Sequence, residues 1–456
     1  ALQNPAFAPT MRTALSGDPA AILLVEFAGA DLGSLKAQLS RLEALMGDLK
    51  LPGSVVCMTD PSAQRNLWEV RKAGLNIMMS LRGDGKPVSF IEDCAVPLEN
   101  LAEYTSALTE VFQRHGSRGT WYAHASVGTL HVRPILDMRK DGAKKMREIA
   151  EEASTLVKQF KGAYSGEHGD GLCRGEWIEW QFGPRIQEAL VAIKQKLDPE
   201  GLLCPQRIVN PPKMDDLSLM RYSPSYQVIP IKPALDWSAW DVQNEAAIEQ
   251  ITAPGTGGDP ANGLAKAVEM CNNNGTCRKF DAGTMCPSYR ITRDEQHVTR
   301  GRANILRMAM SNQLPTENGE IQGIGHPAVK AAMDLCVSCK GCKRECPTGV
   351  DMARMKLEVL NHHQKMHGLT LRQRLISYLP NYAATASQFA PILNLRDKIP
   401  GLAKLSEMLL DLSSERNLPK WRRKHFFNQP QEIVSKEAVL AADKPVVLFV
   451  DTFTGY

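Results

Sequence analysis

The sequence predicts an α+β domain, an open sheet covered by helices, followed by an all-α helical region that carries metal-binding cysteines. Three observations predict this order. Strand-like and helix-like periods alternate through the first 200 residues, six prolines interrupt the pattern between Pro205 and Pro233, and seven of the eleven cysteines fall between Cys271 and Cys346. The 456 residues are enough for several such domains.

The strands and helices of the first domain, which we assign to residues 1–204, follow from their apolar patterns. Strand-like runs occupy residues 21–27, 54–58, 88–91 and 120–123. Apolar side chains recur at helical spacing in three sets: Leu35, Leu39, Leu42 and Met46; Leu98, Leu101, Leu108 and Phe112; and Met146, Ile149, Ala153, Leu156 and Phe160. We expect these helices to cover the sheet.

Proline and glycine predict the remaining boundaries. The prolines and a Pro-Gly-Thr-Gly-Gly-Asp-Pro run at 254–260 indicate a linker over residues 205–262. We expect a helical domain that contains the clustered cysteines at 263–440, with its later helices broken at Pro380, Pro391 and Pro400. Residues 441–456 combine a buried-strand run with a turn signal, which predicts the first strand of a truncated α/β domain in a longer polypeptide.

The composition excludes several classes of protein. With 43% hydrophobic and 23% charged residues, the chain is neither disordered nor fibrous. Its net charge of +4 is too small over this length to indicate a nucleic-acid partner. The sequence contains no run of eighteen apolar residues and no signal-peptide pattern at its start. We therefore expect a cytoplasmic protein, free or at the periphery of the inner membrane. We also expect a homo-oligomer.

Four cysteines form a compact motif in the second half of the chain. Cys336, Cys339, Cys342 and Cys346 are spaced C-x2-C-x2-C-x3-C and are followed by Pro347. This is the bacterial ferredoxin spacing, in which three thiolates hold one 4Fe-4S cluster and the fourth reaches another. A redox dithiol or a zinc ribbon needs no such set of four. The motif predicts an electron-transfer cluster.

A degraded copy of the motif lies upstream. It consists of Cys271, Cys277 and Cys286, with Asn274 at the position of the missing cysteine. By the crossover rule, Cys286 completes the first cluster, and Cys271, Cys277 and Cys346 hold a second. The second cluster is either 4Fe-4S, capped by Asn274 or water, or 3Fe-4S, as in the iron-sulfur subunits of fumarate reductases that the repeat resembles. In a simpler alternative, Cys271 and Cys277 are buried thiols.

The first domain contains two short segments in which histidines occur beside glycines. One contains His124, Gly128 and His131, and the other contains Glu167 and His168. Residues seven apart face opposite sides of a straight strand, but a bend at Gly128 would bring the two imidazoles together. With Glu167 they would form a two-histidine, one-carboxylate site for zinc or another first-row divalent metal. Hydrogen-bonded core histidines are the alternative.

The order of motifs in the first domain resembles a known family. The motifs are Trp68-x-x-Arg71, Glu92-Asp-Cys-Ala-Val-Pro97, His124-x6-His131, Glu167-His168-Gly169, Asp198-Pro-Glu-Gly201 and Asn210-Pro211. Together they resemble the C-terminal half of FAD-linked D-2-hydroxyacid dehydrogenases, over roughly residues 15–215. Joined to a ferredoxin-type region, the chain resembles the bacterial members of that family in which flavin and iron-sulfur modules are fused.

The resemblance implies roles for the histidine segments. His124, His131 and Glu167 would hold the metal, which polarises the 2-hydroxyl and the adjacent carboxylate of the substrate. His168 would be the general base that takes the hydroxyl proton as the C2 hydride leaves for the flavin, a task suited to a near-neutral pKa.

The resemblance also implies substrate and flavin contacts. Arg71 would clamp a substrate carboxylate with its planar guanidinium, and the region of Asn210 would cover the flavin ring. The family's metal loop, H-x-G-D-G-N-x-H-x-N, is altered here, and Arg133 replaces its last asparagine. Arg133 would bind a second carboxylate or lie at the surface or a sheet edge. Lys86 lies near the family's substrate lysine but out of register.

These observations predict a function and two alternatives. We expect oxidation of D-2-hydroxyglutarate, or a close D-2-hydroxyacid, by FAD, with iron-sulfur clusters carrying electrons singly to an external acceptor. No glycine-rich dinucleotide loop occurs in a strand-turn-helix setting, so we expect the FAD-binding domain upstream of Ala1. The alternatives are the same chemistry on D-lactate or glycolate, and a non-catalytic electron-transfer subunit.

Overall fold

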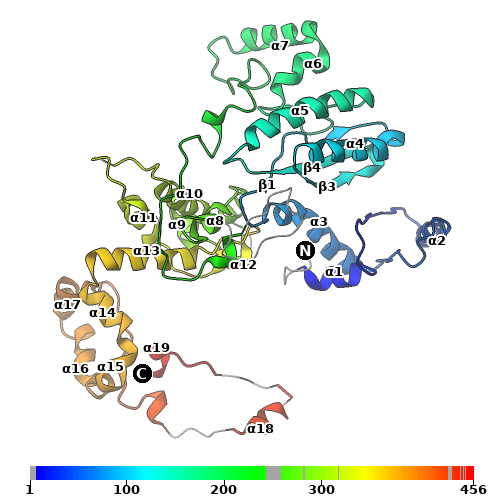
Figure 1. Cartoon of the computed structure of the whole chain (residues 1–456). Coiled ribbons are helices and arrows are strands. Elements are labelled where there is room, and N and C mark those ends of the chain that lie inside the picture. Colours follow the sequence, from blue (N-terminus) through cyan, green and yellow to red (C-terminus); the bar gives the residue numbers. More distant parts are fainter. Residues whose placement is uncertain are drawn as a thin grey trace. The chain divides into compact units, whose positions relative to one another are not determined.

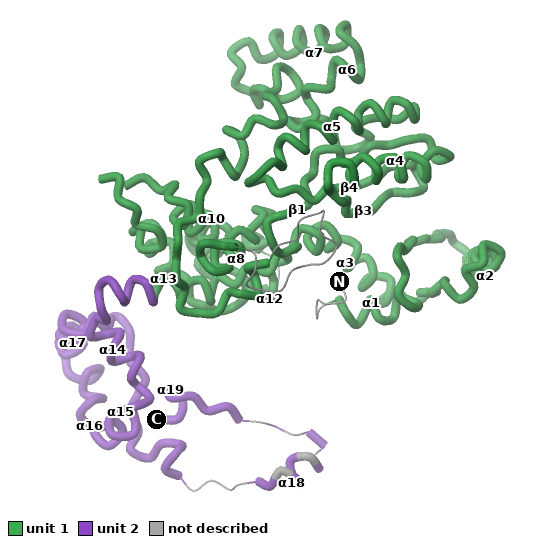
Figure 2. The backbone as a smooth tube through the Cα atoms, viewed as in Figure 1, with its two compact units in different colours: residues 1–360 green, residues 361–456 purple. Residues whose placement is uncertain are grey.

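The computed structural model describes residues 7–242, 258–280, 283–316, 318–429, 434–441, 443–444, 446 and 448–456. The chain divides into two compact units, residues 1–360 and residues 361–456, which Figure 2 distinguishes by colour. The first unit contains the sheet and all seven clustered cysteines. The second is helical in its described residues.

One long strand organises the sheet of the first unit. β4 (Thr129–Leu136) pairs antiparallel with the whole length of β3 (Gly119–His124), through its residues 129–134. On the other edge of β4, two short strands pair in turn, β1 (Lys86–Pro87) and β2 (Cys94–Ala95). Every residue of β4 is buried, so both faces of this central strand are covered.

Two helices cover one face of the sheet (Figure 1). α4 (Leu101–Arg114) and α5 (Gly142–Gln159) pack on each other and on β4. Leu130 and Val132 join the apolar side chains of both helices in one buried cluster. Because successive strand residues face opposite sides, the residues between and beyond these two point to the other face, where the functional side chains lie.

The other helices before the linker bury few side chains, and the helix predicted around Leu35, expected to cover the sheet, has no buried residue. These helices are α1 (Ala8–Ala14), α2 (Leu32–Asp48), α3 (Pro61–Met79), α6 (Ile178–Phe182) and α7 (Pro184–Leu197). The helices predicted around Leu35, Leu98 and Met146 are all present. α3 begins at Pro61, and the preceding Asp60 caps it, because its carboxylate accepts a hydrogen bond from the backbone N–H of Ala63.

Three of the four strands predicted in the first domain are absent. Residues 21–27 and 54–58 are irregular, and the side chain of Leu23 is 78% exposed. A strand is stable only when its N–H and C=O groups pair with a neighbour, and neither segment joins the sheet. Residues 88–91 are also irregular, although the N–H of Val88 still donates to Pro134 in β4. The strand predicted at 120–123 is confirmed as part of β3.

The described part of the linker is irregular, as its prolines predict, but it ends inside the cysteine-rich core. Trp237 is 2% exposed and donates through Nε1 to Glu358, at 2.8 Å. The other oxygen of Glu358 accepts from the N–H of Ala234. Residues 243–257, which include the start of the Pro-Gly run, lie outside the described residues.

The cysteine-rich region consists of short helices around a second apolar core. The helices are α8 (Leu264–Glu269), α9 (Pro287–Thr292), α10 (Thr299–Met310), α11 (Pro327–Asp334), α12 (Gly341–Glu345) and α13 (Met352–His367). Cys271, Cys277, Cys286 and Cys342 are buried within this core. The cysteines are therefore gathered by helix packing.

The second unit continues as helices α14 (Leu371–Ser377), α15 (Leu379–Gln388), α16 (Ala390–Leu393), α17 (Leu402–Leu410), α18 (Lys436–Leu440) and α19 (Thr452–Gly455). The breaks predicted at Pro380, Pro391 and Pro400 coincide with the starts of α15, α16 and α17. The strand predicted within 441–456 does not form among the described residues there, which offer it no pairing partner. Among the described residues, no helix is both long and apolar enough to cross a membrane.

Candidate active site and iron-sulfur centres

A glycine turn brings the two predicted metal-site histidines together. His124 ends β3, His131 lies in β4, and their ring centroids are 5.1 Å apart. Between the strands, Gly128 has a φ of +69°, and a Cβ at this position would lie 2.0 Å from the carbonyl oxygen of Val96. Only glycine fits both the left-handed conformation and this close approach. The bend is therefore built into the backbone.

Glu167 completes a group of donors around these rings. Its Oε1 lies 2.8 Å from Nε2 of His131 and 4.0 Å from Nε2 of His124. The three donor atoms lie within 4.8 Å of one another, and the side chains of His124 and Glu167 are about half exposed. Two imidazoles and a carboxylate that converge beside solvent could hold a divalent metal with open positions for substrate.

His131 is the buried member of the group, with its side chain 3% exposed. Burial lowers the pKa of His131, although the nearby carboxylates of Glu167 and Glu92 oppose this effect. A lowered pKa keeps the imidazole neutral, which is the form that binds metals.

His168 adjoins this set from the solvent side. Its ring stacks on that of His131 at 5.2 Å between centroids, and its Nε2 lies 3.6 Å from Oε1 of Glu167. The side chain is 50% exposed. An imidazole beside the donor group and open to solvent can accept a proton from a molecule bound there.

Asp93 holds the Glu167–His168 segment in place. Its Oδ2 accepts hydrogen bonds from the backbone N–H groups of Glu167, at 2.7 Å, and His168, at 2.6 Å. Arg174 pairs with the other oxygen of Asp93 and donates to the carbonyl of Gly169 at 2.6 Å. Burial alone would raise the pKa of Asp93, but these hydrogen bonds and Arg174 lower it below its ordinary value.

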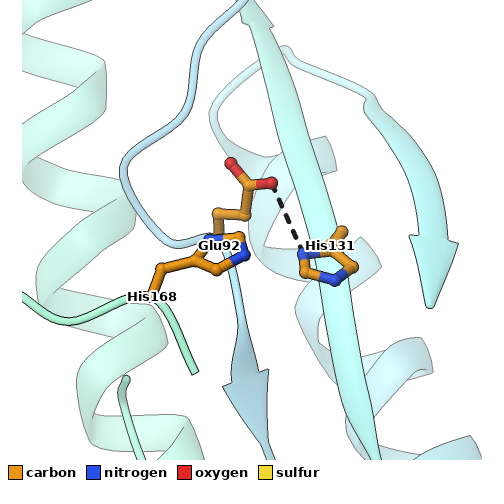
Figure 3. Close-up of side chains that lie close together, drawn as sticks. All are labelled: Glu92, His131 and His168. Carbon is orange, nitrogen blue, oxygen red and sulfur yellow. Dashed lines mark ion pairs between the residues drawn. The ribbon is translucent and has the colours of Figure 1, made fainter. Parts of the chain in front are cut away.

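Glu92 lies on the other side of His131 (Figure 3). Its Oε1 is 3.4 Å from Nδ1 of His131, accepts from the hydroxyl of Tyr122 at 3.4 Å, and pairs with the guanidinium of Arg133. Ser89 donates to its second oxygen. Glu92, His131 and His168 form a second group of three donors within 4.8 Å of one another.

Arg133 is buried, not at the surface or a sheet edge. Its residue exposure is 3%, and it shares the face of β4 with His131. Nη2 is engaged by Glu92 and Tyr122, whereas Nη1 is buried without a hydrogen-bond partner among the described residues. Arg71, on α3, lies over the ring of Tyr122 at 4.8 Å. Both predicted arginines therefore meet at Tyr122, next to the histidines.

Asn210 and Lys86 have other surroundings. Asn210 is exposed and has a φ of +50°, and the neighbouring Pro211 packs against Gly175. Lys86 donates to the carbonyl of Leu81 at 2.5 Å and to the sulfur of Met270 at 3.3 Å. The ammonium of Lys86 therefore faces the cysteine-rich region.

Three of the four cysteines expected to hold the first cluster accept backbone hydrogen bonds at sulfur. Cys286 accepts from the N–H of Thr299 at 3.0 Å, Cys339 from Gly341 at 3.5 Å, and Cys342 from Met352 at 3.3 Å. Donors of this kind stabilise thiolate ligands and tune the potential of a bound cluster. Burial chiefly raises the pKa of Cys286, and the neighbouring thiol of Cys336 adds to this effect.

The second set of thiols surrounds a cavity. Cys271, Cys277 and Cys346 line a small cavity of about 10 Å³, together with Asn274. Burial raises the pKa of Cys277 to about 12, and the nearby thiols of Cys286, Cys271 and Cys346 add to it. Thiols gathered in this way ionise when a metal or cluster binds. The grouping of Cys346 with the upstream cysteines is the one that the crossover rule predicts.

Asn274 is poorly placed as a fourth ligand. Its side chain is exposed, its Oδ1 accepts from the N–H of Thr276 at 2.9 Å, and its Nδ2 donates to Asn272 at 2.6 Å. A side-chain oxygen engaged in this turn would have to leave it to reach iron. The geometry favours three protein ligands.

Sequence reasoning missed the roles of four residues of the site. Glu92 and Asp93 lie inside a motif singled out above but had no assigned role, and neither Arg174 nor Tyr122 was considered. Asp93 and Arg174 are 81 residues apart, so no local spacing relates them. A buried aspartate beside a strand needs a partner, and that requirement is the signal that could have prompted the search.

Comparison with known families identifies the class of both parts. The family of FAD linked oxidases, C-terminal domain, matches residues 6–208, and the 4Fe-4S dicluster domain matches residues 267–350. The chain thus carries an FAD-linked oxidase C-terminal domain followed by a helical 4Fe-4S domain. The second match contains all seven clustered cysteines.

Individual relatives are similarly informative. The chain is 27% identical to D-2-hydroxyglutarate dehydrogenase of Haemophilus influenzae, over 95% of this chain and 44% of that protein. The enzyme of the same name from Escherichia coli is 27% identical, over 84% of this chain and 39% of that protein. The glycolate oxidase subunit GlcD of Bacillus subtilis is 24% identical over 41% of this chain and 39% of that protein. The chain spans less than half the length of these relatives.

Proposed function

We propose that this chain is the substrate-binding and electron-transfer part of an FAD-dependent dehydrogenase that oxidises D-2-hydroxyglutarate to 2-oxoglutarate. The observation that carries the proposal is the convergence of His124, His131 and Glu167 beside a solvent-exposed His168, in a chain that also contains paired cysteine motifs. The names of two relatives that match most of this chain support the choice of substrate.

The site residues divide the work of the reaction. His124, His131 and Glu167 would hold the metal, and Nε2 of His168 accepts the proton of the 2-hydroxyl. Bound FAD supplies the hydride acceptor, and the bound metal supplies a Lewis acid that polarises the hydroxyl. Asp93 holds the backbone of Glu167 and His168 in place by accepting hydrogen bonds from their N–H groups. Asn210 would lie at the flavin.

Two guanidinium groups would select a dicarboxylate. Arg71 binds one carboxylate of the substrate, and the unpartnered Nη1 of Arg133 offers a buried donor for the second. A buried cationic donor without a partner is costly, and an anionic substrate group would relieve that cost. D-lactate and glycolate lack the second carboxylate.

Two clusters would carry the electrons away. Cys286, Cys336, Cys339 and Cys342 would hold a 4Fe-4S cluster, and Cys271, Cys277 and Cys346 would hold a second cluster with three protein ligands. Electrons then pass singly to an external acceptor. We place the domain boundaries at 204, 262 and 440, and the protein in the cytoplasm as a homo-oligomer.

The test is a visible spectrum of the longest natural form of the protein, purified without oxygen. We expect D-2-hydroxyglutarate to bleach both flavin and iron-sulfur bands, and D-lactate to leave them unchanged. His168→Ala should abolish the bleaching, and His367→Ala, an exposed histidine at the end of α13, should not. Bleaching by D-lactate would favour the D-lactate alternative, and no bleaching by either would favour a non-catalytic electron-transfer subunit.

A further inference from the structure

We propose that Glu92 is the positioning residue of the metal site, which holds the imidazole of His131 so that its Nε2 faces Glu167. The inference rests on the proposed metal site and concerns a residue that contacts one of the metal ligands. Figure 3 shows Glu92 and His131 side by side, joined by the ion pair between Oε1 and Nδ1 at 3.4 Å.

The two ring nitrogens of His131 have separate surroundings. Nε2 lies 2.8 Å from Glu167, on the side shared with His124, whereas Nδ1 faces Glu92. Nδ1 is buried and has no hydrogen-bond partner of good geometry among the described residues. A buried ring N–H requires an acceptor, and Oε1 of Glu92 is close enough to become one through a small rotation. A proton fixed on Nδ1 leaves the lone pair of Nε2 free for a metal.

The surroundings of Glu92 suit it to orienting His131 and not to binding the metal. Its exposure is 8%, and its Oε1 also faces the guanidinium of Arg133 and the hydroxyl of Tyr122. Ser89 engages Oε2. A carboxylate neutralised by arginine and committed to several donors has little charge left for a metal. The same contacts fix the carboxylate in space, which is what a positioning residue needs.

Stacking restrains the ring in the remaining direction. The ring of Tyr122 lies 4.7 Å from that of His131, nearly parallel, and His168 stacks at 5.2 Å. With its plane held by these rings, the imidazole can still flip about its Cβ–Cγ bond, which exchanges Nδ1 with Cδ2 and Nε2 with Cε1. The carboxylate of Glu92 selects between these orientations, because only one of them presents an N–H to it.

The experiment is a Zn²⁺ titration of the longest natural form of the protein, stripped of metal, against a chromophoric chelator. Carboxylates behind metal-bound histidines typically contribute 10- to 100-fold in affinity. We expect Glu92→Gln to weaken Zn²⁺ binding by about 10-fold or more. Glu92→Asp should recover part of the loss, and Glu103→Gln, at an exposed position on α4, should change nothing.

Two further variants separate positioning from folding. Glu92→Gln leaves the buried Arg133 without its counter-charge, so we pair it with Arg133→Gln to restore charge balance. We expect the double variant still to bind Zn²⁺ weakly, and recovery to the native affinity would overturn the proposal. In a His131→Ala background, Glu92→Gln should have no added effect. If His131→Ala itself binds Zn²⁺ like the native protein, the proposed metal site fails, a result distinct from the failure of Glu92 alone.

Discussion

Arg139 and Glu269 form an ion pair between the oxidase domain and the cysteine-rich region, with Nη1 3.0 Å from Oε2. Glu269 is buried and lies two residues before Cys271. Burial raises the pKa of Glu269, although Arg139 opposes the effect. Arg139 also pairs with Asp84, near β1. The pair therefore links the turn that follows β4, the strand of His131, to the loop that begins the upstream cysteine motif.

We predict that this pair contributes to stability in a coupled manner. Arg139→Met and Glu269→Gln should each lower the free energy of unfolding by about 3 kcal/mol, because each leaves a buried charge or acceptor without its partner. The double variant should lose less than the sum. Urea unfolding of the four proteins measures the coupling. The exposed pair Lys72 and Glu69 is the control, for which the same cycle should give a coupling of about 0.5 kcal/mol or less.

Lys86, at the same boundary, should make stability depend on pH. Burial lowers its pKa to about 8, although Glu269 opposes this shift. Between this value and the ordinary pKa of 10.5, the unfolded chain binds more protons, so stability rises with pH. We expect a rise of about 2 kcal/mol between about pH 7.5 and 9.5 in the native protein relative to Lys86→Met. Urea midpoints across this range measure it, and parallel curves for both proteins would contradict the assignment.

The sequence predicted helices more reliably than strands. Apolar spacing marked α2, α4 and α5, because a helix forms its hydrogen bonds within itself. The runs at 21–27 and 54–58 have strand-like patterns, but a strand depends on a distant partner that no local pattern reveals. The pairing of His124 and His131 was predictable because, like a helix, it depends on residues close together in the sequence. His124 and His131 are close in sequence, and the intervening Gly128 was a visible signal for the bend.

Gly128 should not tolerate replacement by a residue with a side chain. In Gly128→Ala, the new Cβ would meet the carbonyl of Val96, and the left-handed φ adds strain. We expect a loss of about 3 kcal/mol of stability and at least 10-fold weaker Zn²⁺ binding, because the two histidines move apart. Gly53→Ala is the matched control, since φ there is +72° with open space around it. It should cost only about 1 kcal/mol and leave Zn²⁺ binding unchanged.

The crossed pairing of the cysteines can be tested by removing one thiol from each set. Cys346→Ser should lose the cluster of the cavity and retain the other, and Cys286→Ser should do the reverse. Iron and sulfide content with EPR spectra of the anaerobic proteins measure this. Cys57→Ser, at an exposed position, is the control. If Cys346→Ser instead removed the cluster of Cys336, Cys339 and Cys342, the motif would be uncrossed.

Asp93 should contribute both to the stability of the domain and to metal affinity, although it is not one of the proposed metal ligands. Asp93→Asn removes the charge that Arg174 neutralises and weakens the acceptor for the N–H groups of Glu167 and His168. We expect a loss of about 3 kcal/mol at neutral pH, since it leaves the buried Arg174 without its partner charge. Zn²⁺ binding should also weaken, because Glu167 loses its backbone anchor.

The pH dependence of this loss follows from the sign of the pKa shift. The folded pKa of Asp93 lies below its ordinary value of 3.8, so the stabilisation is present above 3.8 and is lost as pH falls through the folded pKa. The difference in free energy of unfolding between the native protein and Asp93→Asn should therefore stay constant from about pH 7 to pH 5. It should become smaller below pH 3.8. Urea midpoints measure both ranges. Asp60→Asn, which alters only the exposed cap of α3, should cost about 1 kcal/mol or less and leave Zn²⁺ affinity intact. If it weakened Zn²⁺ binding as much as Asp93→Asn, the effect would be general loosening of the domain and not the anchoring of Glu167.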